Sequence, residues 1–157
     1  MQEHPFPPIV FKNSKILILG SFPSLKSFEN SFYYSHPHNQ FWKILSEISG
    51  YPINNKDQKI WLLKELNLAL WDIVQSCKRE NSSDANLKDI TPNDIATLLK
   101  EYPNIKKIAF TSRFAQRVFE RYFKDLEVDT LYLPSPSPAY AAMSFKKKCE
   151  IYKERLL

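Results

Sequence analysis

Cysteine and glycine are both scarce in this chain of 157 residues. The two cysteines, Cys77 and Cys149, lie far apart, which excludes an iron–sulfur cluster on four thiolates and a zinc site made of cysteines. We expect both to remain free thiols. The two glycines, Gly20 and Gly50, are too few for a dinucleotide fingerprint or a Walker A loop. Nucleotide cofactors held in those two ways are therefore excluded.

Long apolar runs are absent as well. No segment approaches the ~18 residues of a membrane span, and residues 1–8 have neither the basic nor the apolar region of a signal peptide. We therefore expect a cytoplasmic protein with no contact to a membrane. Hydrophobic residues make up 43% of the chain and aromatic residues 14%, which is enough for a folded core, and the length suits one domain over residues 1–157. The net charge of +5 weakly favours a polyanionic partner.

Short apolar runs alternate with amphipathic stretches along the chain. The run 16–19, ended by Gly20, is typical of a strand buried on both faces. The predicted strands are 16–19, 68–74, 105–110 and 128–133. The predicted helices are 41–49, 57–66, one with its cap and first residue at Thr91 and Pro92, one capped by Ser112, and a last one carrying Ala142, Phe145, Cys149, Tyr152 and Leu156. The polar stretch 75–89 is predicted to be a long loop.

This alternation indicates an α/β domain with three α/β/α layers and a central, mostly parallel sheet of about four strands. In such a sheet the loops that leave the carboxyl ends of the strands lie at one edge, where ligands bind. The loops concerned are 21–39, 75–89, 111–113 and 134–138. We expect any active site to be assembled from them.

Four sequence motifs occupy these loops and their borders. They are GSFPS at 20–24, HPHNQFWK at 36–43, LWDIV with the SSD-x-N stretch at 70–86, and LPSPSPAY at 133–140. Together they resemble the uracil-DNA glycosylase superfamily, and most closely its hypoxanthine (deoxyinosine) DNA glycosylase branch, over residues 15–142. The resemblance implies a DNA glycosylase that acts on double-stranded DNA containing a deaminated base and needs no metal or organic cofactor. No lysine stands out as a Schiff-base nucleophile, so we expect a monofunctional enzyme, and we expect it to be a monomer.

Asn39 is the candidate catalytic residue. An enzyme of this kind flips the nucleotide out of the duplex, and the base then leaves with negative charge, which hydrogen-bond donors stabilise. A carboxamide offers such donors, and the matching Asn of the hypoxanthine branch is regarded as catalytic. The alternative is that Asn39 only caps the helix that begins near Phe41.

The predicted base pocket lies in the first loop and after the third strand. The resemblance places in it Gly20, Ser21, Phe22, Pro23, Tyr34 and Thr111. Tyr34 matches the aromatic residue that stacks on uracil in mismatch-specific relatives, and Phe22 and Tyr33 are further candidates for stacking on a flipped base. The alternative for each of these aromatic residues is ordinary core packing.

The chain departs from the superfamily pattern at two places. Ser21 and Phe22 stand where uracil enzymes carry an Asn or an acid, and Leu133 stands where many relatives carry a His or Asn. Asn39 would then carry more of the catalysis. Asp72 and Asp84 are candidates for orienting water, with a turn or capping role as the commoner alternative.

The candidate DNA-binding residues are Ser24, Arg113, Ser135, Ser137 and Pro138. Small hydroxyls bind phosphates, and prolines stiffen a wedge that enters the minor groove; a plain proline-serine turn is the alternative. Arg117, Arg121 and the run 146–148 are more often a solvated helix face. His36 and His38 favour a turn or a phosphate contact, because two imidazoles make a poor zinc site.

We therefore predict excision of hypoxanthine from deoxyinosine, leaving an abasic site. One alternative is a uracil or mismatch-uracil glycosylase. Another is a non-catalytic module that binds damaged or single-stranded DNA, and a third is a protein-interaction subunit without salt-dependent affinity for DNA.

Overall fold

The computed structural model describes residues 2–30, 32–78 and 88–157. Its elements, in chain order, are β1 (Gln2–Glu3), β2 (Ile16–Gly20), α1 (Leu25–Asn30), α2 (Phe41–Ser49), α3 (Lys56–Glu65), β3 (Leu68–Asp72), β4 (Val74–Lys78), β5 (Lys88–Pro92), α4 (Ile95–Glu101), β6 (Lys107–Phe110), α5 (Arg113–Phe123), β7 (Asp129–Tyr132) and α6 (Phe145–Leu156). Within these described ranges no helix has the length and apolar character needed to cross a membrane.

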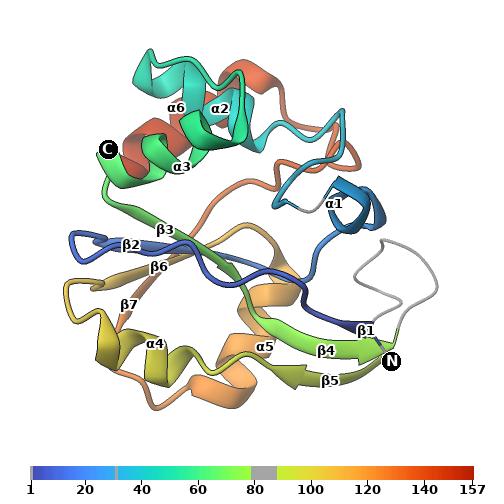
Figure 1. Cartoon of the computed structure of the whole chain (residues 1–157), viewed down its shortest axis with the longest axis vertical. Helices are drawn as coiled ribbons and strands as arrows, with labels where there is room; N and C mark the ends of the chain where they lie inside the picture. Colours follow the sequence, from blue (N-terminus) through green and yellow to red (C-terminus); the bar gives the residue numbers. More distant parts are fainter. Residues whose placement is uncertain (1, 31, 79–87) are drawn as a thin grey trace.

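Four strands form a central parallel sheet in the order β3-β2-β6-β7. Helices α2, α3 and α6 cover one face of this sheet, and α4 and α5 cover the other (Figure 1). The predicted three-layer α/β/α fold with a parallel four-stranded sheet is therefore confirmed. Because all four strands run the same way, their carboxyl ends meet at one edge.

The sheet separates two hydrophobic clusters. Leu17 and Leu19 of β2 point into one of them, together with buried residues of α4 and α5, and we name it the α4/α5 cluster. Ile18 points to the opposite face, where side chains of α2, α3 and α6 pack in the α2/α6 cluster. This alternation explains why β2 is apolar at every position, since a strand covered on both faces has no solvent side.

A second, antiparallel sheet of three strands, in the order β1-β4-β5, was not predicted. The prediction of one long loop over 75–89 is wrong at both ends, because β4 takes up its beginning and β5 its end. Strand β4 buries Val74 and Cys77, three positions apart, and its pairing with β5 shifts register twice. Such irregular pairing removes the two-residue alternation by which a strand is recognised.

The start of helix α4 also differs from its prediction. Thr91 and Pro92 lie in β5, and the cap is Asp94, whose carboxylate accepts a hydrogen bond from the Thr97 amide. Proline is tolerated here because β5 is an edge strand of its sheet. The predicted cap of α5 is confirmed, since Ser112 accepts from the Ala115 amide. Ala142 precedes α6 instead of lying in it.

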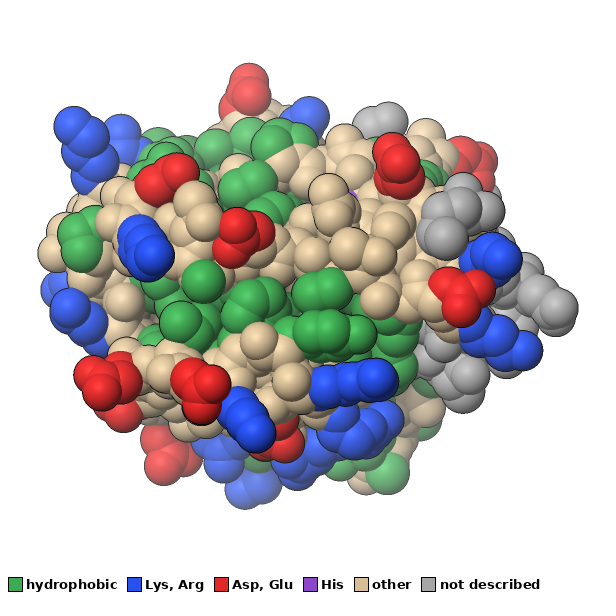
Figure 2. Space-filling view, turned by 90° about the horizontal axis from the view of Figure 1, so that it is seen from below, with side chains coloured by type: hydrophobic (Ala, Val, Ile, Leu, Met, Phe, Trp, Pro, Cys, Tyr) green, Lys and Arg blue, Asp and Glu red, His purple; other side chains and the backbone are tan. Residues whose placement is uncertain are grey.

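Helix α5 is amphipathic, and its outer side is charged. It buries Ala115, Val118 and Phe119 and leaves Arg117 and Arg121 exposed, so these two arginines form a solvated helix face. From the α4 and α5 side, hydrophobic side chains gather near the centre of the molecule, and Lys and Arg side chains lie around its periphery (Figure 2).

Candidate active site

The carboxyl ends of three neighbouring parallel strands meet around Gly20. Gly20 ends β2 and pairs with Asp72, the last residue of β3, while Thr111 directly follows β6. A Cβ atom on Gly20 would lie 2.5 Å from Asp72 Oδ1 and 2.9 Å from the Tyr34 hydroxyl. The same point is 3.4 Å from Thr111 Oγ1. Three oxygen-bearing side chains thus converge at the edge where a site was expected, and only glycine leaves room for them.

Tyr34 lies in this group with a strained backbone. Its φ angle is 52°, a left-handed value that is rare for a bulky residue. Its ring stacks on Phe41, with centroids 4.2 Å apart, and its hydroxyl lies 2.9 Å from Thr111 Oγ1. Strained conformations persist where surrounding contacts hold them, and they cluster at functional sites. The structure therefore brings together Gly20, Tyr34 and Thr111 of the predicted pocket.

Asn39 precedes helix α2 by two residues and is half-buried. Its Oδ1 accepts a hydrogen bond of 2.9 Å from the Phe41 amide, whereas Gln40, at the cap position itself, makes no capping bond with its side chain. A backbone N–H can bond only to an acceptor, so this contact fixes which end of the carboxamide is oxygen. The Asn39 NH₂ group then remains as a donor, with no partner within the described part of the chain. The capping and catalytic interpretations are compatible, because they use different atoms.

The turn that carries Asn39 is tied to the last loop. The Gln40 amide donates to the carbonyl oxygen of Pro136 at 2.9 Å. In that loop Ser135 Oγ accepts from the Ser137 amide, and Ser137 Oγ accepts from the Ala139 amide, each at 3.2 Å. These two local turns stiffen the loop beneath the exposed Pro138. The candidate wedge therefore lies next to the candidate catalyst.

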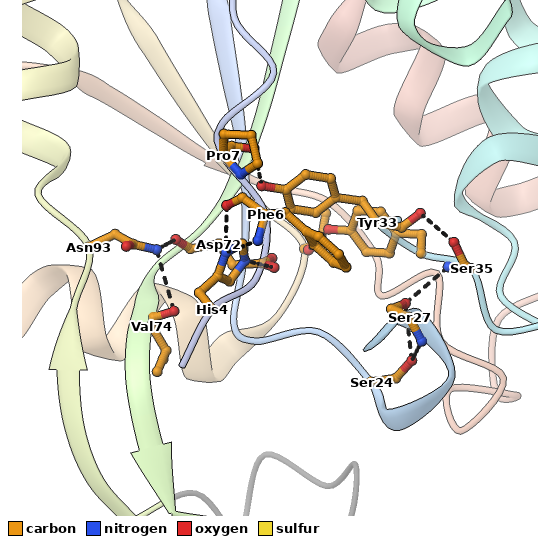
Figure 3. Close-up of polar contacts among 12 residues, drawn as sticks. His4, Phe6, Pro7, Ser24, Ser27, Tyr33, Ser35, Asp72, Val74 and Asn93 are labelled. Atoms are coloured by element: carbon orange, nitrogen blue, oxygen red, sulfur yellow. Dashed lines mark hydrogen bonds and ion pairs between the residues drawn. The ribbon is translucent and has the colours of Figure 1, made fainter. Parts of the chain in front are cut away.

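His4 was missed by sequence reasoning, and it pairs with Asp72. His4 Nε2 lies 2.8 Å from Asp72 Oδ2, and the two side chains are only 2% and 6% exposed (Figure 3). His4 Nδ1 lies 2.8 Å from the Phe6 carbonyl oxygen. The Phe6 amide nitrogen also lies 3.3 Å from Nδ1, so the Phe6 backbone holds one ring nitrogen and Asp72 holds the other. The antiparallel pairing of β1 with β4 delivers His4 to this place.

The other aromatic candidates pack in the interior. Tyr33 is buried in the α2/α6 cluster and donates to the Pro7 carbonyl oxygen at 2.8 Å. Burial, with the charge of Asp72 as a smaller cause, raises the pKa of Tyr33 well above its ordinary value. Phe22 belongs to the α4/α5 cluster, with its ring against His4 and Phe28. Core packing is thus the main role of these two rings.

Ser21, Pro23 and Ser24 hold the first loop in place. The Ser21 carbonyl oxygen accepts from the Val74 amide at 3.0 Å, and Pro23 is buried. Ser24 Oγ accepts from the Ser27 amide at 3.1 Å, in the first turn of α1. The loop is thereby fixed to β4 on one side and to α1 on the other.

The remaining candidates are spread along the edge. Arg113 is exposed, and its guanidinium lies 3.7 Å from the centre of the Tyr132 ring. His36 Nδ1 accepts from the His38 amide, which is the geometry of a turn. Across the described ranges no group of three or more His, Cys, Asp or Glu side chains is placed to hold a metal ion. Asp84 lies outside the described residues.

Comparison with known proteins agrees with this geometry. The profile of the Uracil DNA glycosylase superfamily matches residues 7–156. Among curated relatives, the chain is 33% identical to a hypoxanthine DNA glycosylase of Methanosarcina barkeri over 141 residues, covering 88% of this chain and 89% of the relative. It is 32% identical to the hypoxanthine DNA glycosylase of Methanosarcina acetivorans over 152 residues, covering 96% of both.

A solved structure is similar over nearly the whole fold. It is a solution NMR structure from Methanosarcina acetivorans, provisionally described as a uracil DNA glycosylase, with a TM-score of 0.81, 29% identity and 97% of each chain covered. The superfamily match spans almost the entire sequence, including the strands and loops that carry the site. The chain is a DNA glycosylase that belongs to the uracil DNA glycosylase superfamily.

Proposed function

We propose that the protein removes hypoxanthine from deoxyinosine in double-stranded DNA and leaves an abasic site. The observation that carries this proposal is the orientation of the Asn39 carboxamide, whose oxygen is engaged by the Phe41 amide and whose NH₂ group remains as a donor. Two relatives that share about a third of its residues are named hypoxanthine DNA glycosylases, which supports the choice of base.

The reaction breaks the bond between the sugar C1′ and the base nitrogen. The electron pair leaves with the base, and the Asn39 NH₂ group donates to an acceptor atom of the base, where the negative charge develops. Water adds its oxygen to C1′ and loses a proton, and the base gains one. A fixed donor lowers the barrier because it is already oriented when the charge appears.

Tyr34 and Asp72 have supporting roles in this proposal. One face of the Tyr34 ring rests on Phe41, a rigid support for stacking against a flipped base. Asp72, held in place by His4, orients the attacking water. Ser135, Ser137 and Pro138 form the wedge that fills the gap in the stack, with Ser24 and Arg113 on the DNA backbone.

The test is a cleavage assay on labelled duplexes that carry either one deoxyinosine or one uracil, with alkali added afterwards to reveal abasic sites. We expect cleavage at deoxyinosine and little at uracil. Cleavage only at uracil would make the protein a uracil glycosylase and overturn the proposed base. Salt-sensitive binding without any abasic site would instead identify a non-catalytic DNA-binding module.

A further inference from the structure

Lys148 is a buried cation outside the proposed reaction. It is the last of three consecutive lysines, and while Lys146 and Lys147 are exposed, Lys148 is only 1% exposed. The sequence favours a solvated face for this run, but this holds only for its first two lysines, because α6 turns Lys148 toward the interior.

Among the residues that the structure describes, only uncharged groups bind the Lys148 ammonium. Nζ donates to Gln40 Oε1 at 2.9 Å and to the Tyr140 carbonyl oxygen at 3.0 Å, and it lies 5.2 Å from the centre of the Tyr140 ring. Within the described residues no carboxylate lies within 4 Å of it. Burial lowers the pKa of Lys148, because a buried charge without a countercharge is costly. An ammonium has three N–H donors, so one remains after these two bonds.

Lys148 is one of the residues that line a groove of about 680 Å³. The turn around Asn39 contributes His38 and Gln40, and α2 contributes Lys43. The last loop contributes Ser137 and Tyr140 from the other side. The described lining holds two lysines and no acidic residue, so the groove is complementary to an anion.

We propose that this groove binds one phosphodiester group of the lesion-bearing DNA strand, close to the flipped nucleotide, with Lys148 and Lys43 as its cations. The inference rests on the proposed function, because a nucleotide that reaches Asn39 brings its own phosphates between the same turn and loop. The phosphate supplies the countercharge that Lys148 lacks, and it accepts the third N–H. Lys148 also holds Gln40 and Tyr140, so it connects the bound strand to the walls on both sides of Asn39.

The test combines variants with modified DNA. Duplexes carry a non-cleavable 2′-fluorinated deoxyinosine and a single neutral methylphosphonate, moved one position at a time across the phosphates on either side of it. Affinities are measured by fluorescence anisotropy over a salt series for the wild type, Lys148→Met and Lys43→Ala, with Lys153→Ala as a matched exposed control on α6.

We expect one methylphosphonate position to weaken wild-type binding about tenfold, as loss of a charged hydrogen bond does. Lys148→Met should bind unmodified DNA about tenfold more weakly than the wild type does. The methylphosphonate at the sensitive position should not weaken its binding any further. The slope of its log affinity against log salt concentration should be smaller by about 0.9. Lys153→Ala should stay sensitive to the same position. If circular dichroism shows that Lys148→Met does not fold, Lys43→Ala on the exposed side of α2 carries the same comparison.

Equal losses in wild type and in both variants at every position would overturn the inference. A second outcome would also overturn the inference. Inorganic phosphate at constant ionic strength would displace DNA from the wild type alone, and no methylphosphonate position would change the affinity. The groove would then be a site for free anions. The readout needs no cleavage, so the two proposals fail separately. If the protein cleaves deoxyinosine but shows no such coupling, only the proposed phosphate site is refuted and the proposed function stands.

Discussion

In the proposed reaction the two ends of the Asn39 carboxamide have different roles, and substitution can separate them. Asn39→Ala removes both, so excision of hypoxanthine should fall about 10²–10³-fold and the free energy of unfolding should drop by about 1 kcal/mol through loss of the bond to the Phe41 amide. Asn39→Asp keeps the accepting oxygen and removes only the donor. It should therefore lose the same activity and keep its stability.

Single-turnover cleavage of deoxyinosine and urea unfolding measure these two effects. Duplex affinity serves as the control, since neither variant alters the wedge or the basic residues. An Asn39→Asp protein that retained full excision would reduce Asn39 to a helix cap.

The buried pair of His4 and Asp72 predicts coupled effects. His4→Phe leaves the Asp72 carboxyl group without its partner, which should cost about 1–3 kcal/mol of stability. We also expect kcat to fall, by up to about 100-fold, with KM little changed, because the proposed reaction gives His4 the role of positioning Asp72. A double-mutant cycle with Asp72→Ala measures the coupling, and additive losses of kcat would show that the two residues act independently.

Gly20 and Gly50 form a natural comparison. Gly20→Ala places a methyl group 2.5 Å from Asp72 Oδ1, so side chains of the site must shift, at a cost of about 1–3 kcal/mol and with a large loss of excision. Gly50 ends α2 with a φ of 79° and has open space around it. Gly50→Ala should cost about 1 kcal/mol in backbone strain and leave excision unchanged. Similar activity in the two purified variants would contradict the steric argument.

At the scale of elements, local signals predicted the parallel sheet and its edge. The apolar run of β2 and the Ser112 cap of α5 are encoded within a few residues, so periodicity and capping rules detect them. Three features depend on distant partners and were missed. The irregular pairing of β4 with β5 hides the alternation of buried and exposed residues. His4 reaches Asp72 only because β1 pairs with β4. Lys148 differs from the two lysines before it only in the side of α6 on which it lies.

Helix α6 anchors the last loop through a buried tyrosine. The Tyr152 hydroxyl donates to the Pro134 carbonyl oxygen, and burial raises the pKa of Tyr152, so it remains a neutral donor. Tyr152→Phe should cost about 1–3 kcal/mol because the carbonyl loses its partner in the interior. The loosened loop should raise KM for deoxyinosine DNA several-fold and leave kcat close to wild type. Urea unfolding and steady-state kinetics measure both effects.

Tyr122→Phe on α5 is the matched control, because Tyr122 is 43% exposed and its hydroxyl has no partner within the described residues. It should change neither stability nor KM. If Tyr152→Phe lowered kcat as strongly as Asn39→Ala, the loop would contribute to the chemical step as well as to binding.

At the scale of the whole molecule, the candidate active site lies at the edge of the sheet, between the two hydrophobic clusters. Gly20 and Asp72 end two of the strands that the hydrophobic clusters share, and Thr111 follows a third. Tyr34 reaches them by resting on Phe41 of the α2/α6 cluster. Phe22, in the same first loop, packs into the α4/α5 cluster. A change in either cluster therefore reaches the site through a short path of packed side chains.

This shared sheet predicts that the chain unfolds as one unit. Ile108→Val in the α4/α5 cluster and Ile44→Val in the α2/α6 cluster should each lower the free energy of unfolding by about 0.5–1.5 kcal/mol. Because the same strands support both clusters, each substitution should shift the urea midpoint equally by circular dichroism and by tryptophan fluorescence, to which the buried Trp42 of the α2/α6 cluster contributes. If Ile108→Val left the fluorescence midpoint in place while the circular dichroism transition split in two, the faces would be separate folding units. The candidate active site between them would then be lost when the less stable face unfolds.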